Sequence, residues 1–290
     1  MKVKKSLILA AGKGTRFLPF TKAYPKEMLA VIDKPALQLL VEEVVAAGIR
    51  DVAVVISPEK QKIVEHFTPN TVYEKQLREN GKIAEADALR QLDNLADVTF
   101  LYQPVPNGTG NAVALAEDWA NGEPFAVLNG DDVMLNEKSV TLQLTEAFEQ
   151  CGKCVVGVQT VTKEAIKKYA TCKVVESFGR LHKIDDIVEK PKTDAEIFSL
   201  LAPLGRYVVT PDVFDVIRRT PKRGSEVYLT DSLQIMAKKD GIFVYDFEGE
   251  RFDFGDKLGY LKGVTRFALA DERFSADYLQ YLHDLLKNKQ

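Results

Sequence analysis

The sequence predicts an α/β fold in which a mostly parallel sheet carries helices on both faces and gains antiparallel strands in the second half of the chain. Short apolar runs that alternate with longer segments of helical period predict the parallel part. Apolar runs that follow one another without helices, after about Cys154, predict the antiparallel part. With 290 residues, of which 46% are hydrophobic and 28% charged, the chain has the composition of a globular protein with a large core.

The first half of the chain is a series of units, each an apolar run followed by a helix. The predicted strands are SLILA (6–10), VAVVI (52–56), VTFLY (98–102) and FAVLN (125–129). The helices that follow them are predicted near 35–48, from about 58, near 109–120 and near 138–150. Strands in this order form a parallel sheet, and such sheets bind ligands at the carboxyl ends of their strands.

The second half begins with three strand-like runs, and the last two are joined by a turn at Phe178-Gly179-Arg180. These runs cover residues 154–161, 172–179 and 181–190. Helices are predicted again near 194–201, 211–219 and 230–239, followed by the apolar run 241–247 and two closing helices from about 257 and 274. Because no proline-rich or glycine-rich linker and no repeat interrupts the chain, we expect one continuous domain over residues 1–290.

Charge and hydropathy exclude several classes of protein. The 39 basic and 42 acidic residues leave a net charge of -3, so the chain lacks the overall basic character that favours nucleic acid or an anionic membrane. The first apolar run is about six residues long before Lys13 interrupts it, too short for the core of a signal peptide. No window reaches the roughly 18 apolar residues of a membrane helix, and we expect a cytoplasmic protein.

The cysteines and histidines match no known type of site. Three cysteines are an odd number and argue against a disulfide framework. Cys151 and Cys154 form a C-x-x-C, but no second pair lies at zinc-site spacing, so we expect a structural role for both. The three histidines are scattered along the chain and fit neither a metal-binding nor a triad pattern.

The loop after the first strand, AAGKGTRFLPFTKAYPKEML (10–29), has the character of a phosphate-binding loop. Gly12 and Gly14 permit close approach of the backbone to an anion, and Lys13 and Arg16 add positive charge. Its spacing differs from both common phosphate fingerprints, since Phe17 replaces the third glycine of G-x-G-x-x-G and no P-loop motif is present. A plain dehydrogenase and a P-loop NTPase are therefore disfavoured.

Carboxylates gather at later strand ends. The motif NGDDV brings Asp131 and Asp132 to the end of the fourth strand. EKP then carries Glu189 and Lys190, and FDFGDK carries Asp253. Carboxylates beside a phosphate-binding loop suit Mg²⁺, which takes one or two carboxylates together with phosphate oxygens. Each motif alone is explained as a turn, a cap or a strand end. Their joint occurrence indicates a site.

Six motifs, taken in order, resemble those of the bacterial UTP-glucose-1-phosphate uridylyltransferases, members of the sugar nucleotidyltransferases. They are AAGKGTRFLPFTKAYPKEML, VIDKP, GDD, VEKP, GRYVVTPDVFD and FDFGDKLGYLK, between about residue 4 and residue 268. The resemblance implies a Rossmann-like sheet with a sugar-side extension, of the nucleotide-diphospho-sugar transferase type, with a nucleotide part over about 1–150 and a sugar part over about 151–290. It also implies Mg²⁺, a homodimer or homotetramer, and the reaction of UTP with α-D-glucose 1-phosphate to give UDP-glucose and pyrophosphate.

The resemblance assigns nucleotide contacts to residues of two loops. Ala11, Gly12 and Gly14 are expected to bind the nucleotide and its phosphates through backbone N–H groups. Gln103, in QPVPNGTGNAV, matches the residue whose amide meets the uracil edge, and Gly108 lies close to the base. The nucleotide site is thus expected to combine the first loop with the loop after the third strand.

The resemblance also assigns the charged residues. Arg16 is expected to neutralise the pyrophosphate leaving group, and Lys26 to reach the triphosphate. Glu189 would accept hydrogen bonds from sugar hydroxyls, and Lys190 would hold the sugar phosphate. Because Pro191 follows, we expect Lys190 to have an extended or polyproline backbone. Two carboxylates match the metal ligands of the family, Asp131 and Asp253.

The chemistry of this reaction accounts for the residue types. The attacking phosphate oxygen is already anionic at neutral pH, so attack on the α-phosphorus requires no proton abstraction and no histidine base. The reaction requires alignment of two anions that repel each other and stabilisation of the charge on pyrophosphate. Arg16, Lys26 and Lys190, together with the metal, supply both.

Alternatives stay open for the substrates. Thr109-Gly110-Asn111 stands where the family reads leucine-glycine-histidine, and Ala170 stands where a glycine usually follows the tyrosine near the sugar pocket. A glutamine amide can also turn to match cytosine as well as uracil. The alternatives are the same chemistry with another nucleotide or sugar 1-phosphate, or a non-catalytic regulatory paralogue. Retention of the charged residues argues against the paralogue, because unpaired buried charges are costly.

Overall fold

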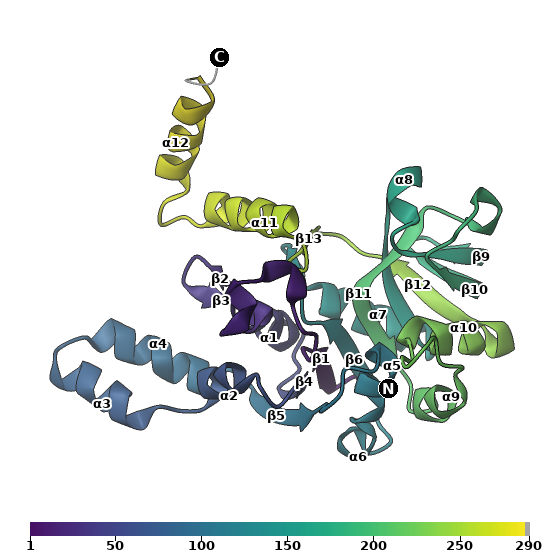
Figure 1. Ribbon diagram of the computed structural model, residues 1–290, viewed down its shortest axis with the longest axis horizontal. Coiled ribbons are helices and arrows are strands. Elements are labelled where there is room, and N and C mark those ends of the chain that lie inside the picture. The colour runs from purple at the N-terminus through teal and green to yellow at the C-terminus, as the bar shows by residue number, and fades with distance from the viewer. Residues whose placement is uncertain (288–290) are drawn as a thin grey trace.

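The computed structural model describes residues 1–287 and has one large sheet at its centre (Figure 1). The nine strands follow the spatial order β5-β4-β1-β6-β11-β8-β12-β10-β9. Their bounds are β1 (Lys5–Leu9), β4 (Asp51–Ile56), β5 (Asp97–Tyr102), β6 (Phe125–Asn129), β8 (Val155–Thr160), β9 (Ala170–Phe178), β10 (Leu181–Glu189), β11 (Leu201–Val209) and β12 (Ile242–Asp246). The predicted α/β class is confirmed.

Strands β5, β4, β1 and β6 run parallel, as predicted. Leu7 of the central strand β1 is in register with Ala53 of β4 and with Val127 of β6. Because both faces of β1, β4 and β6 are covered, these three strands are almost continuously apolar, which accounts for runs such as FAVLN. Their parallel direction brings the carboxyl ends of β1 and β6 to the same edge of the sheet.

Helices lie on both faces of this sheet. The helices of the described residues, some of which lie away from the sheet, are α1 (Ala36–Ala46), α2 (Gln61–Phe67), α3 (Thr71–Glu79), α4 (Ile83–Asp93), α5 (Thr109–Ala114), α6 (Glu117–Ala120), α7 (Val140–Cys151), α8 (Lys163–Ile166), α9 (Val213–Arg219), α10 (Leu229–Asp240), α11 (Lys257–Ala270) and α12 (Ser275–Lys287). The longest of them as described, α11, has 14 residues. Along residues 1–287, none is both long enough and apolar enough to cross a membrane.

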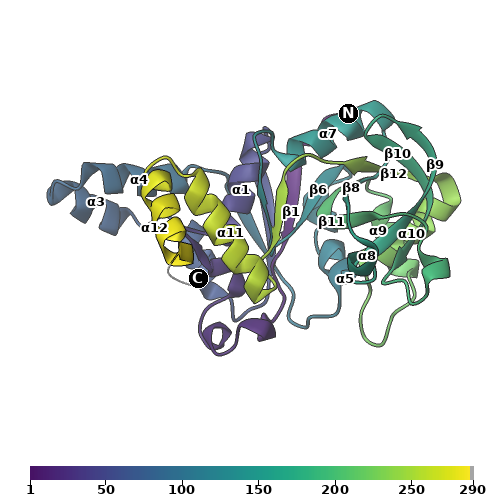
Figure 2. The same ribbon diagram turned by 90° about the horizontal axis from the view of Figure 1, so that it is seen from above.

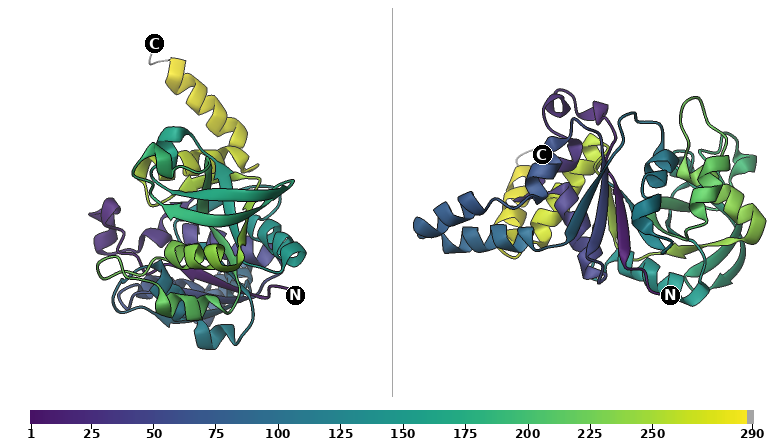
Figure 3. Two further views of the ribbon diagram at one scale, coloured as in Figure 1. Left: turned by 90° about the vertical axis from the view of Figure 1, so that its right-hand side faces the viewer. Right: turned by 90° about the horizontal axis from the view of Figure 1, so that it is seen from below.

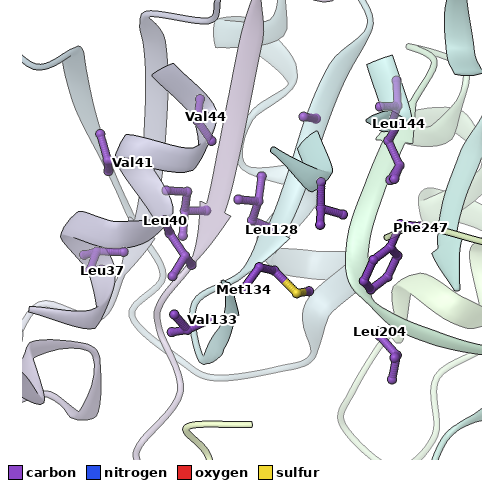
Figure 4. Close-up of a cluster of buried hydrophobic side chains, with 14 of the residues drawn as sticks. Leu37, Leu40, Val41, Val44, Leu128, Val133, Met134, Leu144, Leu204 and Phe247 are labelled. Carbon is purple, nitrogen blue, oxygen red and sulfur yellow. The ribbon is translucent and has the colours of Figure 1, made fainter. Parts of the chain in front are cut away.

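The two faces carry separate apolar clusters, and the side chains of β1 alternate between them. Ile8 belongs to the cluster formed with α1 and α7, part of which Figure 4 shows around Leu40 and Leu128. Leu7 belongs to the opposite cluster, which includes Val113 of α5 and side chains of α9 and α10. The alternation follows from the pleat of a strand, in which successive side chains point to opposite faces.

The second half of the chain adds antiparallel pairs, as predicted. β9 and β10 form a hairpin with Leu181 opposite Phe178, and β10 also pairs antiparallel with β12. β8 and β12 are parallel to each other. β11 lies between β6 and β8 and runs antiparallel to both, so it joins the two halves of the chain into one sheet (Figure 2).

The helix predicted near 194–201 is wrong. Only a 3₁₀ turn, Asp194–Glu196, forms there. The chain then runs beside Thr171, whose hydroxyl accepts a hydrogen bond of 3.1 Å from the amide of Ser199. β11 begins directly afterwards, at Leu201. The segment is extended because it leads into a central strand of the sheet.

Several short or protruding elements are also absent from the predictions. β7 (Asp132–Leu135) pairs with β13 (Glu250–Asp253), and β2 (Ala30–Val31) pairs with β3 (Lys34–Pro35). The helices α3 and α4 form a hairpin that extends away from the body. The helix α12, which was predicted, also extends away from the body (Figures 1 and 3). The short helix α8 separates β8 from β9, where strands without helices were expected.

Candidate active site

Two adjoining cavities open near the carboxyl ends of β1 and β6. The first has a volume of about 320 Å³ and the second about 280 Å³. Thr109, Asn129, Asp131 and Tyr228 line both, so the cavities share a wall. The site therefore has room for two ligands side by side, with Asp131 at their junction.

The predicted site residues divide between the two cavities. Those that line the first are Ala11, Gly12, Lys26, Gln103, Gly108 and Asp131. Those that line the second are Arg16, Asp131, Glu189, Lys190 and Asp253. Asp131 belongs to both groups. The fold thus gathers around one site nearly all the residues that the motifs indicate.

Gly14 lines neither cavity and has a conformational role in the first loop. Its φ is +63°, in the left-handed region, and it precedes the 3₁₀ turn Thr15–Phe17. A β-carbon at this position would lie 3.1 Å from Cγ2 of Thr21, whose hydroxyl donates a hydrogen bond of 2.8 Å to the Gly14 carbonyl. At Gly12, by contrast, a β-carbon would have no described atom within 4 Å. Gly12 is thus open to a ligand, and Gly14 shapes the loop.

Lys26 and Asp131 form an ion pair at the junction of the cavities. Burial alone would lower the pKa of Lys26, but the carboxylates of Asp131 and Glu27 raise it above its usual value. Burial alone would raise the pKa of Asp131, but the Lys26 ammonium holds it below its usual value. Both groups are therefore charged.

A second ion pair, which is buried, joins Lys60 and Glu27 and was not indicated by any motif. Lys60 Nζ donates hydrogen bonds to Glu27 Oε2 at 2.7 Å and to the Ala10 carbonyl at 2.5 Å. Burial raises the pKa of Glu27 and lowers that of Lys60. The pair ties the end of β1 to the segment that carries Lys26, so it fixes the loop. Its partners are 33 residues apart, and no local pattern signals such a contact.

Asp131 and Asp253 face a common space beside Gly255. A β-carbon at Gly255 would lie 2.8 Å from Asp131 Oδ2 and 2.9 Å from Asp253 Oδ1. The space is open because this residue has no side chain. Two carboxylates that converge in this way fit a hard divalent cation, which takes its other ligands from phosphate oxygens and water. Within residues 1–287, no group of three or more His, Cys, Asp and Glu side chains is placed to hold a metal ion.

Asp132 has a different role from its neighbour Asp131. Its Oδ1 accepts a hydrogen bond of 2.6 Å from Arg251 Nε. Arg251 Nη1 donates in turn to the hydroxyl of Tyr169 at 3.0 Å, and both of these residues line the second cavity. Arg251 was not predicted, because it lies 119 positions from Asp132 and only the pairing of β7 with β13 brings the two together.

Glu189 and Lys190 line the second cavity together, although they are adjacent in the chain. The extended backbone expected at Lys190 is wrong, since its φ is +51°, in the left-handed region. This turn ends the strand alternation that would send the two side chains to opposite faces. Burial raises the pKa of Glu189, and the adjacent ammonium of Lys190 opposes that rise. A left-handed non-glycine residue costs about 1–3 kcal/mol and is typical of functional sites.

The loop after β5 closes the first cavity. Gln103 Nε2 donates a hydrogen bond of 2.8 Å to Asn107 Oδ1. The φ of Gly108 is +102°, and a β-carbon there would lie 2.2 Å from the Val227 carbonyl oxygen. Gly108 is therefore required by its conformation and by the close approach of Val227.

Comparison with known proteins shows the family to which the chain belongs. Residues 5–267 match the nucleotidyl transferase family. The chain belongs to the nucleotidyl transferases. It is 40% identical over 288 residues to UTP–glucose-1-phosphate uridylyltransferase 2 of Staphylococcus saprophyticus, covering 99% of each chain. It is 39% identical over 290 residues to UTP–glucose-1-phosphate uridylyltransferase of Bacillus subtilis, covering 100% of this chain and 99% of that one.

Solved structures of UDP-glucose pyrophosphorylases are also similar to this chain. A UDP-glucose pyrophosphorylase complexed with UDP-glucose is 33% identical and superposes with a TM-score of 0.83, covering 93% of this chain and 100% of that one. The UTP-bound enzyme from Acinetobacter baumannii is 30% identical with a TM-score of 0.90, covering 98% and 99%. The resemblance inferred from the motifs is confirmed, and so is the Rossmann-like sheet type.

In this nucleotidyl transferase, the segment 226–230 forms the wall between the cavities, and no motif indicated it. Tyr228 lines both cavities, and its hydroxyl donates to the Glu226 carboxylate. The amide of Leu229 donates a hydrogen bond of 3.0 Å to Thr109 Oγ1. Thr109, one of the departures from the family pattern, thus connects this wall to the loop that carries Gln103.

Proposed function

We propose that this nucleotidyl transferase transfers UMP from UTP to the phosphate of α-D-glucose 1-phosphate, giving UDP-glucose and pyrophosphate. The observation that carries the proposal is the pair of adjoining cavities that meet at Asp131. It is supported by the 40% identity, over 99% of this chain, to UTP–glucose-1-phosphate uridylyltransferase 2 of Staphylococcus saprophyticus. The first cavity would hold the nucleotide and the second the sugar phosphate.

The proposed reaction is an in-line displacement at the α-phosphorus. An oxygen of the sugar phosphate forms the new P–O bond, the bond between the α-phosphorus and the bridging oxygen breaks, and pyrophosphate leaves with the electron pair. Because the attacking oxygen is already an anion, the residues around it have no proton to remove. Their task is to hold two anions close together and to balance their charge.

We assign that task to the cations of the site. Lys190 would bind the sugar phosphate in the second cavity, beside Glu189, whose carboxylate would accept hydrogen bonds from the sugar hydroxyls. Lys26 would meet the triphosphate and exchange its contact with Asp131 for one with a phosphate oxygen. Arg16 would stabilise the leaving pyrophosphate. Its Nη1 donates a hydrogen bond of 3.2 Å to the Gly255 carbonyl, which holds it beside Asp253.

Nucleotide contacts in the first loop are part of the proposal. Ala11 and Gly12 line the first cavity, where their backbone N–H groups would face the phosphates, and Gly14 would maintain the loop conformation. Gln103 would meet the uracil edge, with Gly108 close to the base. We also propose that the single chain has a nucleotide part over about 1–150 and a sugar part over about 151–290.

A divalent metal ion is typical of nucleotidyl transferases, and we propose Mg²⁺ held by Asp131 and Asp253. When bound, the ion would neutralise phosphate charge and orient the triphosphate. The converging carboxylate oxygens beside Gly255 support this assignment.

We further propose a homodimer or homotetramer located in the cytoplasm. Along its described length α12 buries none of its side chains, and it exposes Leu279, Tyr281, Leu285 and Leu286, which supports a contact with another copy. The proposed location follows from the substrates, because charged phosphate esters do not cross membranes unaided.

A pyrophosphate-release assay tests the proposal. The purified chain is incubated with UTP, glucose 1-phosphate and Mg²⁺, and each component is omitted in turn. Pyrophosphate is expected only from the complete mixture, and EDTA is expected to abolish it. Parallel reactions contain CTP, ATP, dTTP or another sugar 1-phosphate. Higher turnover with another pair would overturn the substrate assignment. Binding without turnover in any mixture would overturn the catalytic one.

A further inference from the structure

Gln103 lines the first cavity, and the nitrogen of its side-chain amide is bonded to the protein. The side chain is 6% exposed, and its main-chain amide donates a hydrogen bond of 2.8 Å to the Ile56 carbonyl. Its Nε2 donates to Asn107 Oδ1 at 2.8 Å and lies 3.4 Å from the Gly108 carbonyl oxygen. Its Oε1 accepts no hydrogen bond from residues 1–287. The amide nitrogen is therefore committed to the protein, and the oxygen is free for a ligand.

The two acceptors around Nε2 determine this orientation. A backbone carbonyl can only accept a hydrogen bond, so the Gly108 oxygen requires a donor opposite it. If the Gln103 amide turned over, its oxygen would face both the Gly108 oxygen and Asn107 Oδ1. With the Asn107 amide as it stands, three acceptors would then meet with no proton between them, and the hydrogen bond to Asn107 would be lost. If the Asn107 amide turned over as well, the oxygens of Gln103 and Gly108 would still face each other without a donor.

Asn107 is itself held in place from two sides. Its main-chain carbonyl oxygen accepts hydrogen bonds from Asn111 Nδ2 at 2.7 Å and from the amide of Val227 at 2.9 Å. Asn111 is one of the departures from the family pattern, and this contact gives it a structural role. The main chain that carries the Asn107 side chain, and with it the acceptor for Gln103, is thus already in position before any nucleotide binds.

We propose that Asn107 is a positioning residue for base specificity, because it fixes Gln103 so that Oε1 selects uracil over cytosine. The N3 atom of uracil carries a hydrogen and can donate to Oε1, whereas the N3 atom of cytosine carries a lone pair and cannot. A site built to receive a donor discriminates strongly against a ligand that lacks it. The inference rests on the proposed function, since it requires a pyrimidine nucleotide in the first cavity.

Steady-state kinetics with UTP and with CTP test the role of Asn107. The wild type is expected to prefer UTP. Asn107→Ala removes the acceptor and is expected to lower the ratio of the kcat/KM values for UTP and CTP about tenfold, the value of one hydrogen bond of ordinary strength. Asn107→Asp keeps an acceptor at the same position and is expected to restore most of the preference. The KM for glucose 1-phosphate is expected to change less than about twofold, because the second cavity is untouched.

The outcomes separate this inference from the proposed function. General damage to the loop would lower the rates with UTP and CTP alike, and an unchanged ratio in Asn107→Ala would overturn the role of Asn107. A wild type without preference between the two nucleotides would overturn it as well. Asn80→Ala, on the protruding hairpin, is the matched control and should leave the ratio unchanged. If the wild type makes no pyrophosphate from either nucleotide, the proposed function fails, and calorimetric binding of UTP and CTP to the same variants still decides the inference.

Discussion

Lys26 and Asp131 neutralise each other at the wall between the two cavities. The pair lies where the nucleotide phosphates and the sugar phosphate would meet. Each of these partly buried charges therefore has its counter-charge, which avoids the cost of an unpaired ion. Under the proposed function, a phosphate that binds to Lys26 would release the Asp131 carboxylate.

Asp131→Asn is expected to lower kcat by a factor on the order of a hundred or more while the fold is retained. The amide keeps the shape of the side chain but removes the negative charge that faces the space beside Gly255. Turnover is measured by pyrophosphate release and folding by circular dichroism. Asp118→Asn, on the exposed surface of α6, is the matched control. Near-normal Mg²⁺-dependent turnover of a folded Asp131→Asn would remove this residue from the site.

Arg16→Ala is expected to weaken the binding of UTP and pyrophosphate by about tenfold and that of glucose 1-phosphate much less. Its guanidinium would contact one substrate only, and a charge-assisted hydrogen bond is worth about 1.5–3 kcal/mol. Equilibrium binding of each ligand is measured by calorimetry, with the exposed Arg219→Ala as control. An equal loss for both substrates would indicate general damage to the loop and would contradict the assignment.

Lys190→Ala is expected to raise the KM for glucose 1-phosphate, or to lower kcat, by about tenfold or more with UTP affinity largely retained. Lys190→Arg is expected to restore little activity, because a planar fork differs in shape from a compact ammonium. Lys192→Ala, two positions along the chain and exposed, is the matched control. An unchanged dependence of the rate on glucose 1-phosphate in Lys190→Ala would rule out the sugar-phosphate role.

Glu43→Gln is expected to lower the free energy of unfolding by about 3 kcal/mol, the cost of leaving a buried charge without its partner. Glu43 pairs with Arg206, which is 1% exposed, through hydrogen bonds of 3.0 and 2.7 Å. Glu42→Gln, one position earlier in α1, removes a partly exposed pair with Lys34 and should cost less than about 1 kcal/mol. Urea unfolding of both variants measures the difference, and equal values would contradict it.

The three cysteines are expected to differ in their reaction with a thiol reagent. Burial raises the pKa of Cys154 to about 11, and burial also raises that of Cys172. Both thiols are therefore protonated and inaccessible at pH 8, whereas Cys151 is partly exposed. Titration with an aromatic disulfide should modify one thiol per native chain and three after denaturation. Rapid modification of two or three thiols in the folded chain would contradict this prediction.

The strands most readily predicted from sequence are those whose apolar runs are uninterrupted. VAVVI and FAVLN were found because they are apolar throughout and end in turn residues. β11 was not found, because Pro203, Gly205 and Arg206 break its pattern. The charge of Arg206 is tolerated in the core only because Glu43, 163 positions away, neutralises it. A contact between residues so far apart in the chain produces no periodic pattern in the sequence.

In the site as well, residues in local motifs were predicted, whereas residues that depend on contacts between distant segments were not. Motifs indicated Asp131 and Lys190, because each follows a predicted strand in a recognisable pattern. The partners Arg251 and Lys60 depend on contacts between distant segments, and the role of Asn107 depends on a loop conformation. The backbone of Lys190 was predicted wrongly, since the preference set by Pro191 was overridden by the surrounding structure.

The left-handed backbone of Lys190 limits how this cavity can evolve. Glycine or asparagine would suit the conformation but would carry no cation, and arginine would carry a cation of another shape. Under the proposed role of Lys190, few single substitutions at this position therefore keep both the left-handed backbone and a compact cation. Divergence toward another sugar phosphate is more accessible through neighbouring positions such as Ala170, whose methyl group lines the same cavity and carries no charge. Lineages that change substrate should thus keep the lysine and vary the residues around it.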